Sequence, residues 1–195
     1  MFLKIGIRTL AWLLVISLIV PSGIFAQARD ASSAPPAKYK QEELEQMLAP
    51  IALYPDDLLA QMFMASTYPL EIVEADRWAK ANPNLKGTQL ATALEKQAWD
   101  PSIKSLVNFP SVLSMMSDKL DWTQNLGNAF LAQQKDVMDT VQRLRAKAQA
   151  NGSLKTTKEQ KVTTQAQTII IEPASPQVIY VPAYSPTVVY GVWPY

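Results

Sequence analysis

The chain has 195 residues, of which 48% are hydrophobic and 18% are charged, and its formal net charge is +1. This balance is that of a globular protein, and the near-neutral charge gives no electrostatic reason to bind nucleic acid or an anionic membrane. The absence of His and Cys excludes, within this chain, imidazole and thiolate metal sites, disulfides, and Ser-His or Cys-His nucleophile pairs. We therefore predict no cofactor and no metal, and any catalysis would depend on carboxylates, Lys, Tyr or Ser.

Residues 1–28 have the order of a secretory signal peptide. Lys4 and Arg8 precede an apolar run over residues 10–20, and Ala28 closes a small-residue cleavage site. We expect cleavage there and a location in the periplasm or at the outer membrane. An uncleaved membrane anchor is the alternative, but the run is shorter than the about 20 residues that a span needs. Cleavage would change the formal charge from +1 to −1 and leave no stable transmembrane span.

The next segments predict a flexible linker over residues 29–40 and a helical domain over residues 41–152. In the helical domain, apolar residues recur at helical spacing in short stretches that prolines interrupt. Proline suits the first helical turn because its missing N–H would have no partner there. Four helices are expected to begin in this way, at Tyr54-Pro55, Tyr68-Pro69, Asp100-Pro101 and Phe109-Pro110.

Acidic residues follow the first two of these prolines. Asp56, Asp57 and Glu71 would meet the positive end of a helix dipole, and we interpret them as helix-start residues. A cluster of catalytic carboxylates is the alternative interpretation.

The last helix of this domain is expected to be the longest and to stop at Asn151-Gly152. Three basic residues precede the stop: Arg143, Arg145 and Lys147. We expect them to complement the negative end of the helix dipole rather than to form a binding patch.

The end of the chain changes to β-branched and aromatic residues. A polar linker over residues 153–166 would lead into a short β ribbon over residues 167–191, with residues 192–195 beginning a Pro/Tyr-rich tail. Part of the ribbon repeats after ten residues, and its strands are predicted over residues 168–171, 177–181 and 187–190. The predicted fold class is α+β: a mostly α-helical domain of short proline-initiated helices, followed by a small C-terminal β ribbon.

Two long blocks of sequence carry a family resemblance. Residues 47–78, "MLAPIALYPDDLLAQMFMASTYPLEIVEADRW", and residues 168–191, "TIIIEPASPQVIYVPAYSPTVVYG", resemble the two hallmark blocks of the exported bacterial family catalogued as domain of unknown function 3300. The first block has Met47-Leu48 where members of that family usually have two leucines. The resemblance implies a signal-bearing protein of Gram-negative bacteria and no particular reaction or cofactor. Many relatives continue into a low-complexity region where this chain stops at Tyr195, so we expect a truncated product.

Our first functional hypothesis is a non-catalytic structural or interaction module of the cell envelope, and an enzyme is the less favoured reading. The ribbon could pair with an envelope protein through strand addition, or simply pack on its own helices. The candidate partner-binding residues are Tyr180, Tyr184, Tyr190 and Trp193.

The alternatives concern the cell wall. A carboxylate-dependent enzyme acting on cell-wall glycan would need two suitably spaced acids, and the candidates are Asp57, Glu71 and Glu74, with Asp56 and Asp76 nearby in sequence. A third hypothesis is binding of a wall polymer without cleavage, through the aromatic rings that are expected to be exposed near the C-terminus: Tyr184, Tyr190, Trp193 and Tyr195.

Overall fold

The computed structural model describes residues 38–175 and 178–192, and this part has the expected α+β fold, mostly helical with a small β hairpin. The expected signal peptide, most of the linker over residues 29–40, Trp193 and the last two residues lie outside the described residues. Among the described residues, no helix combines the length and apolar character needed to cross a membrane.

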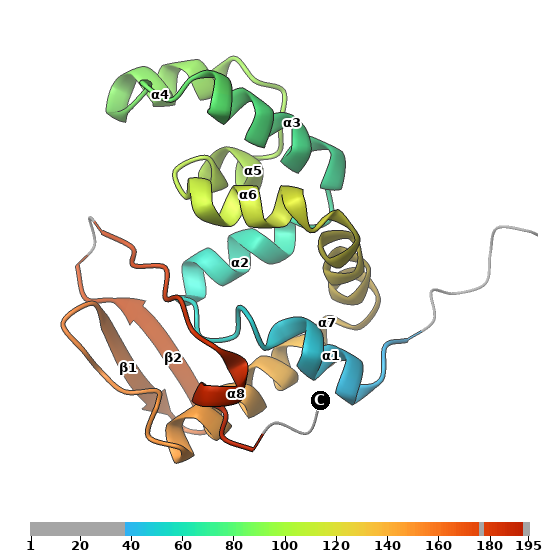
Figure 1. The fold of residues 1–195 in the computed structure, drawn as a ribbon, viewed down its shortest axis with the longest axis vertical. Coiled ribbons are helices and arrows are strands. Elements are labelled where there is room, and N and C mark those ends of the chain that lie inside the picture. Colours follow the sequence, from blue (N-terminus) through green and yellow to red (C-terminus); the bar gives the residue numbers. More distant parts are fainter. Residues whose placement is uncertain (1–37, 176–177, 193–195) are drawn as a thin grey trace, which may run out of the picture. The chain divides into compact units, whose positions relative to one another are not determined.

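Helices make up the first two thirds of the described part, and the hairpin and one short helix follow (Figure 1). The elements are α1 (Gln41–Leu48), α2 (Asp56–Ala65), α3 (Pro69–Ala81), α4 (Gly87–Glu95), α5 (Pro101–Leu106), α6 (Pro110–Asp118), α7 (Leu120–Ala150), β1 (Gln160–Gln165), β2 (Thr168–Pro173) and α8 (Pro186–Val189).

All four proline-initiated helix starts are confirmed. Helices α3, α5 and α6 have proline in their first turn, and α2 begins directly after Pro55. Asp56, Asp57 and Glu71 lie in first turns, as the helix-start interpretation requires. The longest helix is α7, which ends before Asn151-Gly152 as expected, with a break in its backbone at Gln133.

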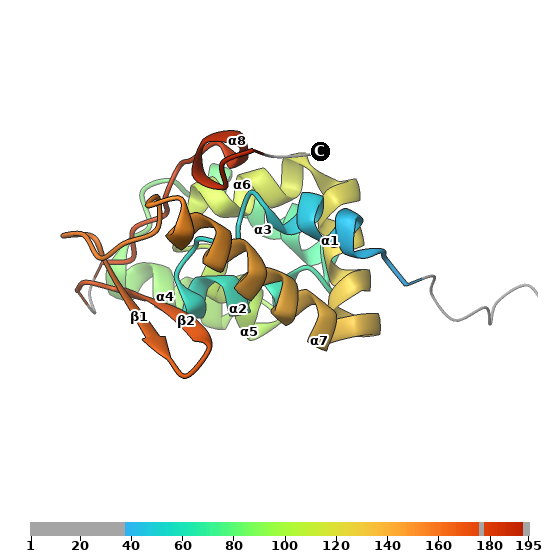
Figure 2. The ribbon, with the colours of Figure 1, turned by 90° about the horizontal axis from the view of Figure 1, so that it is seen from below.

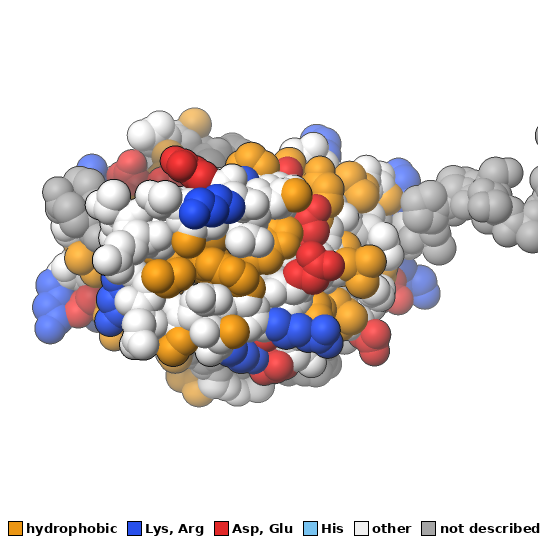
Figure 3. Space-filling model, turned by 90° about the horizontal axis from the view of Figure 1, so that it is seen from above, with side chains coloured by type: hydrophobic (Ala, Val, Ile, Leu, Met, Phe, Trp, Pro, Cys, Tyr) orange, Lys and Arg blue, Asp and Glu red, His pale blue; other side chains and the backbone are white. Residues whose placement is uncertain are grey.

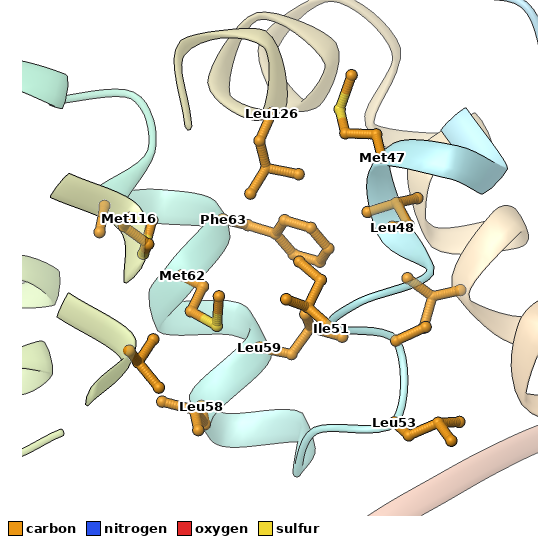
Figure 4. Packing of buried hydrophobic residues seen from close by; sticks show 14 of the residues in the cluster. Met47, Leu48, Ile51, Leu53, Leu58, Leu59, Met62, Phe63, Met116 and Leu126 are labelled. Atoms are coloured by element: carbon orange, nitrogen blue, oxygen red, sulfur yellow. The ribbon is translucent and has the colours of Figure 1, made fainter. Parts of the chain in front are cut away.

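The hydrophobic core surrounds α2. Figure 4 shows Phe63 of α2 lying among Leu48 and Ile51 on one side and Leu126 of α7 on another. Phe63 also stacks on Phe130, with 5.2 Å between the ring centroids. Helix α7 runs past α1 and α2 toward the β hairpin (Figure 2). It therefore contacts α1, near the start of the described chain, and β2, in its C-terminal part.

The expected linker over residues 153–166 is wrong in its second half, because β1 lies there. β1 pairs antiparallel with β2, from Gln160 opposite Pro173 to Gln165 opposite Thr168. The two-residue turn places Ala166 at φ 54°, without the Asn-Gly pair that usually marks such turns. β1 consists mostly of polar residues, as suits a strand with neither face deeply buried. A pattern of hydrophobic residues therefore could not predict this strand.

The expected second and third strands are also wrong. Near residues 177–181 the structure has an isolated bridge between Ser175 and Val178. Residues 187–190 begin in α8, which has Pro186 in its first turn like three of the earlier helices. The two halves of the ten-residue repeat therefore differ in structure, and the Ser-Pro of the second half starts a helix.

The expectation that the basic residues near the end of α7 only complement the helix dipole is wrong for Arg145. This side chain is buried, and its Nε donates to the carbonyl of Ala52 at 2.8 Å. Its Nη atoms donate to the carbonyls of Tyr54 at 3.1 Å and Ile169 at 2.8 Å, and pair with the Asp56 carboxylate at 2.5 Å. One guanidinium thus joins α7 to the α1–α2 loop, α2 and β2.

Lys147 and Arg143 make a second long-range contact. The Lys147 ammonium donates to the buried Glu45 carboxylate at 2.8 Å, and the Arg143 guanidinium lies 3.8 Å from the same group. Burial by itself would raise the pKa of Glu45, but hydrogen bonds from Lys147 and Gln41 and the two positive charges lower it. Glu45 therefore stays ionised and ties α1 to the end of α7.

Two tyrosines fasten the C-terminal segment to the loop after α1. The hydroxyls of Tyr184 and Tyr190 donate to the Ala49 carbonyl at 2.9 and 2.8 Å, and the Leu53 N–H donates to Tyr184 at 3.2 Å. Burial raises the pKa of Tyr190 to about 12 and also raises the pKa values of Tyr184 and Tyr54. These phenols are therefore held in their neutral, donating form.

We expect Arg145→Lys to lower the free energy of unfolding by about 2 kcal/mol or more, because an ammonium cannot satisfy three carbonyls and a carboxylate in that geometry. Urea unfolding followed by circular dichroism measures the change. Lys135→Arg is the control, since Lys135 pairs with Asp139 on the exposed side of α7. Equal stability of Arg145→Lys and the wild type would contradict the assigned role.

We expect the free energy of unfolding to fall as the pH rises above about 10, where unfolded tyrosine begins to ionise. A raised folded-state pKa stabilises the fold below that pH, and the stabilisation is lost as the pH rises toward 12 at Tyr190. Each such tyrosine contributes a slope of about 1.4 kcal/mol per pH unit. Urea unfolding between pH 8 and about pH 11.5 measures it.

Tyr190→Phe should lower stability at pH 8 and reduce the alkaline slope by about one proton. Tyr180→Phe is the control, because it changes an exposed ring. An alkaline slope that is the same in Tyr190→Phe and the wild type would contradict this assignment.

Candidate functional site

A pocket of about 490 Å³ lies between α3, α4 and the junction of α5 with α6. Its shape follows from how α3 ends: the Asn82 side-chain amide donates to the Trp78 carbonyl at 2.8 Å, and Pro83 follows. The chain then reverses into α4, where only Leu94 is buried. Leu90 is partly buried against the core and also forms part of the pocket wall.

The walls of the pocket are mainly apolar. They include the half-buried Trp78, whose ring meets the Trp99 ring edge-on with centroids 5.8 Å apart. The other apolar lining residues are Ala79, Pro83, Leu85, Leu90, Val107 and Pro110. Figure 3 looks onto the side of the molecule where α3 and α4 lie, and a band of hydrophobic side chains crosses that face between charged ones.

One wall of the pocket is polar. Asp76 is 4% exposed and accepts hydrogen bonds from the Lys80 ammonium and the Ser114 hydroxyl, both at 2.7 Å. Burial by itself would raise the pKa of Asp76, but hydrogen bonds from Lys80, Ser114 and Ser117 outweigh it and lower the pKa. The same hydrogen bond to Asp76 raises the pKa of Lys80.

These shifts determine what the polar wall can do chemically. A carboxyl with a lowered pKa is a poor general acid, and a lysine with a raised pKa is a poor base or nucleophile near neutral pH. Asp76 and Lys80 therefore hold each other in their charged forms. The arrangement suits the positioning of a ligand better than proton transfer to it.

Two of the candidate catalytic carboxylates bind one short segment. Glu71 accepts the Asp100 N–H at 2.7 Å, and Glu74 accepts the Trp99 indole N–H at 3.3 Å. Both interactions tie the chain after α4 back to α3. The structure thus gives Glu71 and Glu74 a structural role at the far end of α4.

The acids at the start of α2 lie elsewhere. Asp56 pairs with Arg145, and Asp57 is an exposed residue of the first turn. Neither lines the pocket, whereas Asp76, the last of the acids considered from the sequence, does.

The candidate partner-binding tyrosines divide into two groups. Tyr180 is 57% exposed, so its ring is available to a partner. Tyr190 is buried and Tyr184 half-buried, contrary to the exposure expected for them, because their hydroxyls bind Ala49. Trp193 lies outside the described residues.

Sequence reasoning missed the pocket as a site. Trp78 and Leu90 recur at helical spacing with other apolar residues, which does not distinguish a core position from a pocket wall, and the sequence around Lys80 contains no motif. The available signal was the Pro83 and Gly87 pair, which isolates a short helix. In residues 38–175 and 178–192, no group of three or more His, Cys, Asp or Glu side chains is placed to hold a metal ion.

Comparison with known proteins identifies the family. The chain is 44% identical over 200 residues to the "Uncharacterized protein YacH" of Escherichia coli (strain K12), an alignment that covers 83% of this chain and 32% of the relative. The chain thus spans about a third of that protein's length. No solved structure matches it significantly. The sequence profile described as "Protein of unknown function (DUF3300)" matches residues 40–195, and the chain therefore belongs to the DUF3300 family.

Proposed function

We propose that this chain is a non-catalytic interaction module of the cell envelope and that its binding site is the pocket between α3, α4 and α6. The observation that carries the proposal is an apolar pocket whose ionisable pair, Asp76 and Lys80, is engaged in a salt bridge. Ligand sites are typically apolar hollows with a few fixed polar groups. A hollow without a group poised for proton exchange favours binding over chemistry.

The signal-like order of residues 1–28 supports a location in the periplasm or at the outer membrane. Fractionation of cells that express the full chain tests this part of the proposal. Recovery in the cytoplasmic fraction would contradict it.

The internal role of the ribbon favours the pocket over the ribbon as the binding site. Ile169 and Ile171 are buried, and the Ile169 backbone is bonded to Gln142 and Arg145 of α7. The proposed partner is an envelope component, such as a protein, a wall polymer or a lipid, that inserts an apolar group into the pocket. Tyr180 offers a smaller exposed surface for a secondary contact.

We expect a photo-crosslinking residue at the position of Leu85, which lines the pocket, to form adducts in intact cells, detected as mass shifts on protein or on lipid. The matched control is the same residue at Gln89, an exposed position of α4 outside the pocket. Leu90→Gln in the Leu85-labelled chain should abolish the adducts by making the wall polar.

Equal labelling from the positions of Leu85 and Gln89 would contradict the proposal, as would adducts that persist in Leu90→Gln. A third label at Thr164 of β1 reports the β hairpin. Adducts from Thr164 alone would place recognition on the hairpin and overturn the assignment to the pocket.

A further inference from the structure

We propose that the pocket beneath α4 holds the hydrocarbon chain of a long-chain carboxylate, with the ligand's carboxylate at Lys86. This inference rests on the proposed function, because it names the class of ligand for the same site. The lining, the charges at the rim and the attachment of α4 support it.

The lining fits an unbranched hydrocarbon. At about 490 Å³ the pocket lies within the range of small-molecule sites. The Trp78 and Leu90 side chains offer apolar surface from α3 and α4, and Val107 offers it from the segment before α6. Each methylene removed from water here contributes about 0.8 kcal/mol, so chain length should govern affinity.

The charges at the rim select an anionic head. Asp76 is already bonded to Lys80 and Ser114, so a cationic head would find no available carboxylate there. The Lys80 ammonium is in turn held by Asp76 and lies in the field of Asp118. Lys86, by contrast, lines the rim and belongs to no ion pair among the described residues.

The attachment of α4 permits a chain to enter. Before α4 the backbone is fixed by the Asn82 hydrogen bond to Trp78, and after it by the bonds of Glu71 and Glu74 to residues 99–100. Between these two ties, only Leu94 of α4 is buried. Displacing the middle of α4 therefore exposes little apolar surface, and local opening of this kind has a low free-energy cost.

The test uses the full chain and three probes at concentrations below micelle formation: dodecanoate, dodecan-1-ol and acetate. Isothermal titration calorimetry should give saturable binding of dodecanoate with one site. The alcohol should bind about three- to fivefold more weakly, as expected for loss of one exposed ion pair. Acetate, which has no chain, should not bind measurably.

Variants separate the head from the chain. Lys86→Gln should weaken dodecanoate binding about three- to fivefold and leave dodecan-1-ol binding unchanged. Its matched control, Lys96→Gln, changes an exposed lysine that follows α4 but does not line the pocket. Leu90→Gln should weaken both ligands at least about tenfold, whereas Thr92→Gln, at an exposed position of the same helix, should not. Thermal unfolding verifies that each variant is folded.

The inference is overturned if dodecanoate shows no saturable binding, if Lys86→Gln leaves its affinity unchanged, or if Leu90→Gln and Thr92→Gln behave alike. Failure of this inference can be distinguished from failure of the broader proposal. If dodecanoate does not bind while a protein is still crosslinked from the position of Leu85, the ligand class is wrong and the pocket remains the binding site.

Discussion

The buried guanidinium of Arg145 is the interaction on which the described structure most depends. Removing a cation from water is costly, and the cost is offset only when all its donors have partners. Here the partners are the carbonyls of Ala52, Tyr54 and Ile169 and the carboxylate of Asp56. They come from two segments far apart in the sequence, residues 52–56 and β2, so the charge is satisfied only once the helices and the hairpin are assembled.

Two glutamine side chains extend this use of α7 as a scaffold. The Gln142 amide accepts the Ile169 N–H and donates to the Ile169 carbonyl, as a neighbouring strand would. At the break in α7, the Gln133 amide makes the same pair of bonds with the backbone of Tyr39. Both ends of the described chain are therefore fixed to one helix, which explains why a two-stranded hairpin, marginal by itself, is stable here.

This scaffold leaves α4 as the least embedded of the longer helices. Glu71 and Glu74, which were candidate catalytic carboxylates, bind the segment that follows α4, and Asn82 fixes the segment before α4. Helix α4 is therefore attached at both of its ends above an apolar pocket, and this arrangement is a structural basis for binding. Salt bridges and hydrogen bonds from side-chain amides fix the segments around α7, whereas the weak packing of α4 leaves the pocket accessible.

Local backbone chemistry made the helix starts predictable. Proline's fixed φ and missing N–H act within a single turn, so the starts of α2, α3, α5 and α6 followed from the sequence alone, as did the stop at Gly152. The strand β2 was also predictable, because its run of isoleucines has a strong preference for extended structure.

Long-range burial decided the rest. β1 is polar and turns through Ala166 without a glycine, and residues 187–189 prefer strands by composition yet form α8 after Pro186. The role of Arg145 and the burial of Tyr190 depend on partners about 90 and 140 residues away, which no local pattern encodes. The sequence by itself determined where the four proline-initiated helices begin and which class of fold they build. Only tertiary packing decided which charges are buried, which tyrosines make internal hydrogen bonds and where a pocket remains. These features depend on distances between segments that the chain brings together only when it is folded.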